Sequence, residues 1–519
     1  MDTKVLRQKI LDLAIRGKLV PQDPNDEPAS VLLERIRAEK QQVVKDGKLK
    51  AKDIKNDTVI FKGDDNLHYE QFADGTVKCI EDEIPFELPD GWTWARLGNI
   101  GEIITGGTPS KSHHEYYGNA FPFFKPADLD QGRKTIISSE YLSEKGKSCC
   151  RIIPKFSTAV CCIGSIGKCG YLNVEGTTNQ QINSVIPNID SLYAYYYCSS
   201  DYFLEQLLSL ASATTIAIVN KSKMESVLIP VPPMVEQQRI ANTLDTALGL
   251  IETLEVEKSD IIVAINNVKS KILDLAIRGK LVPQDPNDEP ASVLLERIRA
   301  EKEELIKQGK IKRDKKESVI FKGDDNSYYL RTDKLIESLD DWRFDELPYN
   351  WSLCCLGEIC DYGNCINVDS TSIAESAWIL DLEDIEKDTG IVLKKIKKSE
   401  RNAASTKHLF HKGQVLYSKL RPYLNKVVLA DEDGYCTSEI LPLDFSEIIV
   451  PEYARYFLMS PTFLRYANKC SYGVKMPRLG TTDGKKAILS LPPIEEQKRI
   501  VIAIEKAFSS LSSITENLS

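Results

Sequence analysis

Apolar residues recur at alternating steps of four and three along one segment near the middle of the 519-residue chain. The series consists of Ile240, Leu244, Ala247, Ile251, Leu254, Lys258, Ile261, Ile265, Val268, Ile272 and Leu275, of which only Lys258 is polar. This heptad spacing predicts one long coiled-coil helix. We expect the helix to end before Gly279, because a glycine commonly closes a helix in the left-handed conformation. Such a seam requires a partner helix.

The two halves of the chain repeat each other. The 32 residues Lys9–Lys40 recur without change as Lys271–Lys302. Farther along, Pro232–Ile240 is matched by Pro492–Ile500 at an offset of 260 (492 − 232). The chain therefore consists of two copies of one module of about 260 residues.

The matched segments form a constant frame around two different inserts. Ile100–Pro230 and Ile359–Leu491 occupy corresponding places but share little sequence. Such an arrangement predicts that the two inserts perform different versions of one task.

The repeat also predicts the partner of the long helix. Adding 260 to the residue numbers in the first half of the seam gives positions in Ile500–Leu518. Subtracting 262 from the residue numbers in its last part gives positions in Leu6–Leu13. The terminal helices would then form a second, antiparallel rod, with pseudo-two-fold symmetry and one insert domain at each end. The alternative is that the long helix pairs between two chains. We favour pairing within the chain because the terminal helices otherwise lack partners.

Short apolar runs, turns and helical spacings alternate within each insert, which predicts α+β domains. The expected strands are Phe156–Ile163, Ser184–Ile186 and Gln414–Leu416, the expected loops Gly101–Ser110 and Gly164–Gly170, and the expected helices Leu192–Ala211 and Pro451–Ala467. We divide the chain into an N-terminal helix with a charged connector (1–84), a first insert domain (85–233), a central long helix (234–278), a repeated connector (279–346), a second insert domain (347–493) and a C-terminal helix (494–519).

Each connector begins with the turn-rich sequence PQDPNDEP. Pro28 suits the first turn of a helix that runs to about Lys45, with Asp26 as its cap. The charged stretches Lys45–Asp57 and Lys307–Glu317 follow, and we expect solvated linkers there rather than phosphate contacts.

The composition is that of a soluble globular protein, with 42% hydrophobic and 28% charged residues. The chain has no apolar run of about 18 residues and no apolar N-terminal signal, and its 13 cysteines are odd in number. These features predict a cytoplasmic protein with reduced thiols and no membrane association. The net charge of −9 argues against nucleic-acid binding over the whole surface, but a binding surface can be local.

Motifs for catalysis are missing from the sequence. The stretch Gly146-Lys147-Ser148 has Tyr141 where a phosphate-binding loop requires its first glycine. The histidines and cysteines lack the spacing of metal ligands, although a catalytic Cys–His pair stays open. The sequence therefore predicts a binding protein without cofactor or metal.

Several landmarks carry a resemblance to a known family. They are LPDGWTWARLGNI at Leu88–Ile100 with its counterpart at Leu347–Ile359, ITGGTPS at Ile104–Ser110, IGSIGKCGYL at Ile163–Leu172, TTNQQINSVIP at Thr177–Pro187, SKLRPYLNKV at Ser418–Val427, and the two PP-x-x-EQ-x-RI segments that lead into helices. With these motifs in this order, twice over, the chain resembles the specificity subunit of type I restriction–modification systems.

The resemblance implies a function. Each insert would be a target-recognition domain that reads one half of a bipartite site in double-stranded DNA, and the helical rods would set the gap between the halves. Two modification subunits, each an S-adenosylmethionine-dependent adenine methyltransferase, and motor–nuclease restriction subunits would join this non-catalytic chain in defence against foreign DNA. The competing hypotheses are an enzyme with an unrecognised methyltransferase or nuclease site and a coiled-coil scaffold that binds no DNA.

Candidate DNA contacts are polar or basic residues in the divergent inserts. The first insert supplies Ser110, Lys111 and Lys168 beside glycines for phosphate, and Thr177, Asn179, Gln180 and Gln181 for adenine edges. The second supplies Lys419, Arg421, Tyr423 and Lys426 in one loop, the basic run Lys394, Lys395, Lys397, Lys398 and Arg401, and also Tyr472, Lys475 and Arg478. For each set the alternative is an ordinary turn, a polar strand or a solvated face.

The contacts cannot be copied from one insert to the other. The second copy has Asp361–Asn364 where the first has the GGTPS loop, and Thr437–Ile440 in place of the NQQI segment.

Overall fold

The computed structural model describes residues 2–47, 57–212, 217–309, 318–325, 327–332, 335–339, 347–401, 405–445 and 449–518. The chain divides into two units, Met1–Lys258 and Ser259–Ser519, and each contains one insert domain. The charged stretches expected at Lys45–Asp57 and Lys307–Glu317 lie outside the described residues except at their ends.

The expected long helix is α7, Met234–Ile277, with 44 residues and a length of about 66 Å at 1.5 Å per residue. It ends just before Gly279, whose φ of 66° is left-handed as predicted. The seam is only partly as predicted, because Leu254, Ile261 and Val268 are exposed. Near the end of the helix, Leu273 and Ala276 are buried in place of the expected neighbours. A straight helix drifts by about 20° per heptad from a strict seven-residue repeat, so the buried stripe changes position along α7.

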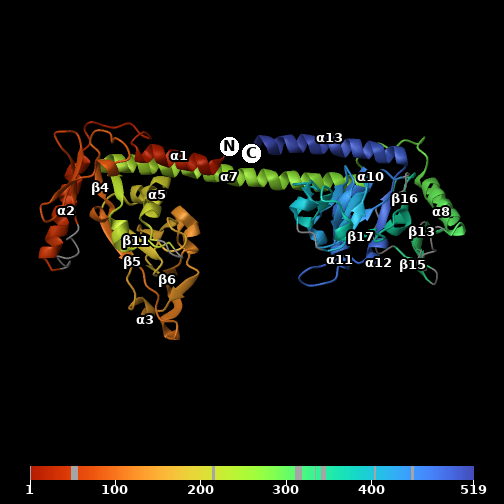
Figure 1. Cartoon of the computed structure of the whole chain (residues 1–519), viewed down its shortest axis with the longest axis horizontal. Helices are drawn as coiled ribbons and strands as arrows, with labels where there is room; N and C mark the ends of the chain where they lie inside the picture. Colours follow the sequence, from red (N-terminus) through yellow and green to blue (C-terminus); the bar gives the residue numbers. More distant parts are fainter. Residues whose placement is uncertain are drawn as a thin grey trace. The chain divides into compact units, whose positions relative to one another are not determined.

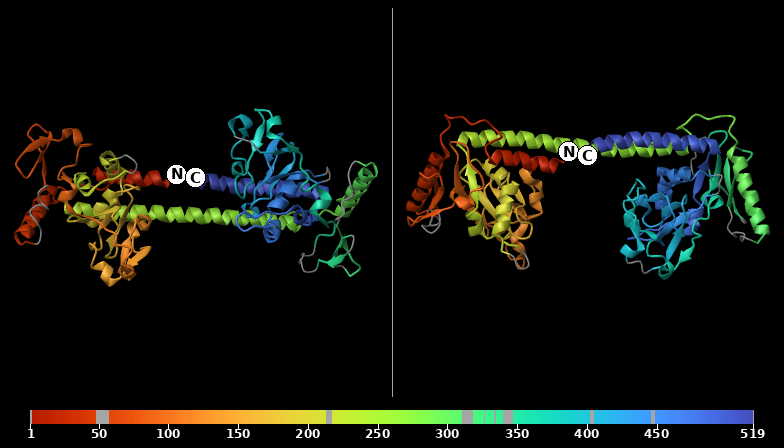
Figure 2. Two further views of the ribbon diagram at one scale, coloured as in Figure 1. Left: turned by 60° about the horizontal axis from the view of Figure 1, so that its bottom comes forward. Right: turned by 45° about the horizontal axis from the view of Figure 1, so that its top comes forward.

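The first unit pairs the beginning of α7 with the N-terminal helix α1, Thr3–Ile15, as Figures 1 and 2 show. The Arg7 guanidinium lies 3.1 Å from the Glu255 carboxylate, whereas the Gln22 amide, farther along the chain, donates to Glu236 over 3.2 Å. Residue numbers thus rise along one segment as they fall along the other, and the two helices are antiparallel.

The second unit pairs the end of α7 with the C-terminal helix α13, Ile494–Leu518 (Figure 1). The Lys269 ammonium lies 5.5 Å above the Phe508 ring, and the Gln284 amide donates to Glu496 over 2.7 Å. This pair is antiparallel as well. Each terminal helix therefore finds its partner within the chain, as predicted.

In each unit, a buried carboxylate joins the insert domain to the helix that follows it, which is α7 in the first unit and α13 in the second. In the first, Glu236 at the start of α7 accepts a hydrogen bond of 3.0 Å from the Trp92 indole. In the second, Glu496 accepts one of 2.9 Å from Trp351. Burial raises the pKa of both carboxyl groups. We call these contacts the Trp–Glu joints, and they fix each insert domain to its helix in the same way.

An ion pair that the sequence did not predict supports each joint. The Asp26 carboxylate accepts from Arg239 over 2.6 Å, and Asp288 accepts from Arg499 over the same distance. Asp26 therefore does not cap the following helix, and that prediction was wrong. This charge-assisted hydrogen bond holds the Asp26 side chain at α7, on which Arg239 lies.

The repeated connector contains more regular structure than the sequence suggested. A helix follows each proline turn, α2 (Ala29–Lys45) and α8 (Ala291–Lys307). The end of α2 at Lys45 is as predicted, but Pro28 is the N-cap residue and does not lie in the first turn. Each unit then has a three-stranded antiparallel sheet, formed by β1 (Val59–Lys62), β2 (His68–Gln71) and β3 (Val77–Cys79) in the first and by β13 (Ser318–Lys322), β14 (Tyr328–Thr332) and β15 (Ile336–Ser338) in the second.

The first insert domain is α+β, as predicted. Strand β4 (Thr93–Arg96) pairs with β12 (Leu228–Val231). A four-stranded sheet has the order β5 (Gly101–Thr105), β11 (Ile182–Pro187), β8 (Thr158–Cys161) and β9 (Cys169–Tyr171). A three-stranded sheet has the order β10 (Thr177–Thr178), β6 (Tyr117–Phe124) and β7 (Glu140–Leu142). Its helices are α3 (Glu144–Lys147), α4 (Ser191–Cys198), α5 (Asp201–Leu210) and α6 (Lys221–Glu225), with short 3-10 turns at η3 (Leu97–Asn99), η4 (His114–Tyr116) and η5 (Asp128–Lys134). The 3-10 turn η2 (Glu81–Glu83) lies just before the domain.

Three predictions for this domain need correction. The first half of the expected loop Gly101–Ser110 is strand β5, which pairs along its whole length with β11. The expected helix Leu192–Ala211 is two helices, because the Ser200 side chain accepts from the Phe203 amide and starts a new one. The expected loop Gly164–Gly170 likewise ends in β9.

The second insert domain is also α+β. Its strands are β16 (Ser352–Cys355) paired with β25 (Ile488–Leu491), a five-stranded sheet in the order β17 (Asn367–Val368), β20 (Lys407–Phe410), β23 (Gly434–Thr437), β18 (Trp378–Leu380) and β19 (Ile396–Lys397), and a three-stranded sheet of β22 (Val427–Leu429), β21 (Val415–Ser418) and β24 (Ile440–Leu443). Its helices are α9 (Leu356–Ile359), α10 (Pro451–Met459), α11 (Pro461–Cys470) and α12 (Thr481–Lys485), with 3-10 turns η7 (Ser370–Ser372), η8 (Leu382–Asp384), η9 (Lys398–Glu400) and η10 (Pro422–Leu424). The expected helix Pro451–Ala467 is broken at Pro461, which has no backbone N–H and begins α11.

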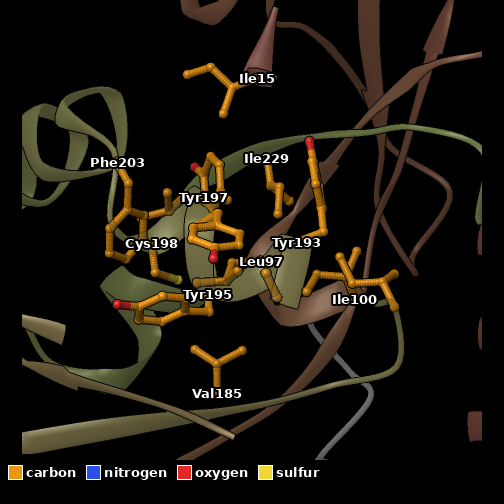
Figure 3. Packing of buried hydrophobic residues seen from close by; sticks show 14 of the residues in the cluster. Ile15, Leu97, Ile100, Val185, Tyr193, Tyr195, Tyr197, Cys198, Phe203 and Ile229 are labelled. Carbon is orange, nitrogen blue, oxygen red and sulfur yellow. The ribbon is translucent and has the colours of Figure 1, made fainter. Parts of the chain in front are cut away.

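Aromatic residues of α4 form the centre of the first unit's core. Figure 3 shows Tyr193, Tyr195 and Tyr197 packed among residues of the insert domain, with Ile15 of α1 nearby. The Tyr193 hydroxyl donates to the carbonyl of Pro230 over 2.7 Å. One core thus holds the terminal helix and the insert domain together, so the loops at the far end of the domain project from a fixed base.

Candidate nucleic-acid interface

Two loops of the first insert domain meet at one edge. The Gly107 amide donates to the Thr178 carbonyl over 2.9 Å, and the Thr108 hydroxyl donates to the side chain of Gln180. A side chain at Gly106 would collide with the carbonyl oxygens of Thr178 and Asn179, so the close approach requires glycine. The fold thereby brings the GGTPS loop next to the NQQI segment, far away in the sequence.

The side chains at this edge that were candidates for reading adenine differ in what they can offer a ligand. Thr177 is buried and its hydroxyl donates to the Arg151 carbonyl over 2.8 Å. Asn179 is buried too, and its amide donates to the side chain of Gln181 over 3.0 Å. Gln180 is exposed. The first two side chains therefore hold the edge in shape, and Gln180 has the amide that faces solvent.

The candidate phosphate ligands of this domain also differ. Lys111 is exposed, and within the described ranges its side chain has no ion pair. The Ser110 hydroxyl lies 2.7 Å from that of Ser112. The Lys168 ammonium is 2.6 Å from the Asp130 carboxylate, which would have to be displaced before a phosphate could bind.

The basic loop of the second insert domain connects β21 with β22. Over the part of the chain that the structure covers, the side chains of Lys419, Arg421 and Tyr423 have no hydrogen bond or ion pair, and Tyr423 is exposed. Arg421 adopts a left-handed backbone with φ of 50°, uncommon for a residue with a side chain. Lys426 is different, because its ammonium donates to the Leu382 carbonyl over 2.7 Å and burial lowers its pKa.

A hairpin packs directly against this loop. Its ends are Tyr472 and Arg478, whose backbones exchange hydrogen bonds of 3.1 and 2.9 Å. The Arg421 amide donates to the Pro477 carbonyl over 2.7 Å. The fold thus gathers two candidate groups, the basic loop and the hairpin, at one place.

Glu439 holds the hairpin in position. Its carboxylate accepts hydrogen bonds of 2.8 and 3.1 Å from the Arg478 guanidinium, and these bonds raise the pKa of the arginine. In the sequence, Glu439 lies within the segment that replaces NQQI, and no role is predicted for it there. An acidic residue in a region expected to bind phosphate is the signal that would have pointed to an internal partner.

The densest basic run of the sequence is largely neutralised. Lys395 lies 2.7 Å from Asp431 and Lys398 lies 2.8 Å from Glu375. Arg401 is mostly buried between Asp381, at 2.6 Å, and Asp384, at 2.7 Å.

Lys394 and Lys397 are exposed, and no ion pair is present for either in the described ranges. The run therefore offers less free charge than its composition suggested. Carboxylates that are distant in sequence, such as Asp431, neutralise most of the positive charge of the run.

No group of three or more His, Cys, Asp and Glu side chains among the described residues could hold a metal ion. In the same ranges, no helix is long and apolar enough to cross a membrane.

Comparisons with known proteins agree with this arrangement. The family model described as "Type I restriction modification DNA specificity domain" matches twice, over residues 89–267 and 348–519. The EcoEI type I restriction enzyme specificity subunit of Escherichia coli is 27% identical over 99% of this chain and 90% of its own length. The EcoAI specificity subunit of the same species is 31% identical over 70% of this chain and 63% of its own length.

A solved structure has a similar fold. It belongs to work on complex assembly and conformational transition of the type I R-M system, and its chain has a TM-score of 0.52 at 15% identity. The match covers 84% of this chain and 94% of that one.

Proposed function

The chain belongs to the family of type I restriction–modification DNA specificity proteins, and from this premise we propose that each insert domain reads one half of a bipartite DNA site. The chain then carries sequence choice, and catalysis resides in its partner subunits. It works in the cytoplasm, where the DNA that it reads is found.

One observation carries the proposal. The two units share the same helix pairing and the same Trp–Glu joint, with Trp–Glu distances of 3.0 and 2.9 Å. Their edges differ: the first presents a glycine loop and an exposed glutamine, and the second a basic loop and a hairpin. A constant frame with two different edges is what a protein requires when it reads two different half-sites.

Side chains of the two edges fit groove recognition. An amide such as that of Gln180 can bind adenine through two hydrogen bonds, and a guanidinium such as that of Arg421 can bind guanine in the same way. Several lysines have no ion pair with any residue that the structure describes and can neutralise phosphates, namely Lys111, Lys394, Lys397, Lys419 and Lys475. These local charges answer the objection raised by the net charge of −9.

The constant frame serves as the scaffold on which the partner subunits assemble. Two modification subunits bind this chain, each bringing an adenine methyltransferase, and restriction subunits join for cleavage. The helix α7, which is unbroken over 44 residues, sets the gap between the half-sites.

Mapping N6-methyladenine in the DNA of cells with and without this gene tests the proposal. We expect one bipartite motif to lose its methylation when the gene is deleted and to regain it on complementation. An unchanged set of methylated motifs in cells that express the modification subunit would refute it.

A further inference from the structure

The hairpin Tyr472–Arg478 of the second insert domain has an apolar tip. We propose that this tip is a wedge, and that Val474 and Met476 enter a DNA groove and partly unstack one base step of the second half-site. The inference rests on the proposed function, since it concerns how this domain reads its DNA.

The tip exposes apolar side chains to an unusual degree. Val474 is fully exposed at 102%, Met476 is 45% exposed, and Tyr472 at the base of the hairpin is 63% exposed. Single exposed apolar residues are ordinary, but three within five positions on one projection form a surface for a ligand. Proteins that kink DNA insert apolar side chains of this kind, Met included, between base pairs.

The hairpin is held firmly enough to act as a wedge. Its ends are closed by two backbone hydrogen bonds, and the Leu479 amide donates to the Lys419 carbonyl over 3.0 Å. The pair of Arg478 with Glu439 fixes the side chain at its base. Gly473, with φ of 100°, permits the turn that presents Val474. If the tip became ordered only on binding, the loss of conformational entropy would offset much of the binding free energy that its contacts contribute.

The charges around the tip select DNA as the occupant. Lys475 lies between the two wedge residues, and Lys419 and Arg421 lie on the loop that is hydrogen bonded to the hairpin. None of these three side chains has an ion pair within the described ranges. Cations that surround an apolar tip match a groove with phosphates on both sides, whereas an apolar protein surface would leave them desolvated and unpaired.

The repeat supports a role in specificity. In the first unit, Ser212 and Ile218 exchange the same two backbone hydrogen bonds, at 3.1 and 3.2 Å. The offset to Tyr472 and Arg478 is 260 in both cases (472 − 212 and 478 − 218). The hairpin base is therefore part of the constant frame.

The residues from one bridge partner to the other differ throughout between the two units. The first stretch is SATTIAI and the second is YGVKMPR, with no identical position. A stretch whose bridge partners keep the same spacing and backbone hydrogen bonds, and whose residues are all different, has the property expected of an element that reads a different sequence in each domain.

The test compares wedge variants in the complex reconstituted with its modification subunits. The wedge variant is Val474→Ala with Met476→Ala, the conservative variant is Val474→Ile with Met476→Leu, and the control is Ile502→Ala, which shortens an exposed aliphatic residue on α13 of the same unit. Each complex is titrated with duplexes that carry the methylated motif of the wild type, with 2-aminopurine placed step by step through the second half-site.

We expect the wild-type and conservative complexes to raise the 2-aminopurine fluorescence at one step, and the wedge variant not to do so. The wedge variant should bind the intact duplex roughly 5- to 150-fold more weakly, the range of one lost base contact. A mismatch at that step, which is already partly unstacked, should restore most of the affinity. The first half-site and the control should be unaffected.

Wild-type affinity and fluorescence in the wedge variant would overturn the inference and leave the proposed function standing. So would a variant that binds DNA normally but no longer assembles with the modification subunits, because the hairpin would then be a protein contact. If the wild-type complex recognises no motif at all, the proposed function fails first, and this result is seen without any variant.

Discussion

Replacing the buried carboxylate of a Trp–Glu joint by alanine should destabilise its unit, whereas replacing it by an amide should not. Glu236→Ala removes the acceptor of the Trp92 indole, which is only 8% exposed, and of the Gln22 amide, which is exposed. Glu236→Gln keeps an oxygen in place for the indole.

The size of the destabilisation depends on which of the two donors can form a hydrogen bond with water instead. A buried donor left without an acceptor costs about 1–3 kcal/mol, and the Trp92 indole is in this position. The Gln22 amide can turn to solvent and adds little. We therefore expect Glu236→Ala to lower the free energy of unfolding by about 2 kcal/mol, or about 4 °C in the melting temperature of a unit of this size. Glu236→Gln should stay within about 1 kcal/mol of the wild type, because it also removes a charge that burial disfavours.

The pH dependence has a definite sign. Burial raises the pKa of Glu236 in the folded chain above its value in the unfolded chain. The stability that this group contributes is therefore complete below the ordinary carboxyl pKa and is lost as the pH rises through the raised one. The stability of Glu236→Gln relative to the wild type should accordingly increase over this pH window.

Urea unfolding of the full chain, followed by tryptophan fluorescence at several pH values, measures these effects. Glu496→Ala repeats the experiment at the second joint, where Trp351 is the buried donor. Glu495→Ala is the control, because its side chain is exposed and, among the described residues, forms an ion pair only with Lys498. If glutamine were as damaging as alanine, or if alanine caused no loss at either joint, the joint would not have the role given to it here.

Three further predictions concern DNA. Replacing Lys419 and Arg421 by alanine should weaken binding by about 1–3 kcal/mol if one of them reads a base, and equilibrium titration at several salt concentrations should separate this from a phosphate contact, which lowers the salt dependence and leaves specificity unchanged. Exchanging Pro85–Ile229 for the matching domain of a relative should change one half of the methylated motif, and a change in both halves on methylome mapping would contradict separate reading. Inserting one heptad between Leu254 and Ile261 adds about 10 Å to α7. The preferred gap, measured by methylation of a library of randomised spacers, should lengthen by about three base pairs at 3.4 Å each, and an unchanged gap in a folded variant would rule out α7 as the ruler.

The sequence alone determined the frame of this protein. Patterns that are local or repeated predict the long helix and the α+β character of both inserts. They also predict that α7 pairs with α1 at its beginning and with α13 at its end. A heptad seam requires a partner, and a duplicated sequence folds twice in the same way. These features depend on the spacing of apolar residues, which a single sequence displays directly.

Only the tertiary structure decided which candidate side chains are free. Lys397 and Arg401 look equivalent in the basic run, yet Arg401 is enclosed by two carboxylates and Lys397 is exposed. Asp26 seemed placed to cap α2, but Arg239, more than two hundred residues away in sequence, binds it.

The exposed tip at Val474 was likewise not evident from its sequence, in which valine is an ordinary core residue. Burial and ion pairing depend on which distant segments the fold brings together, and local spacing carries no record of those neighbours.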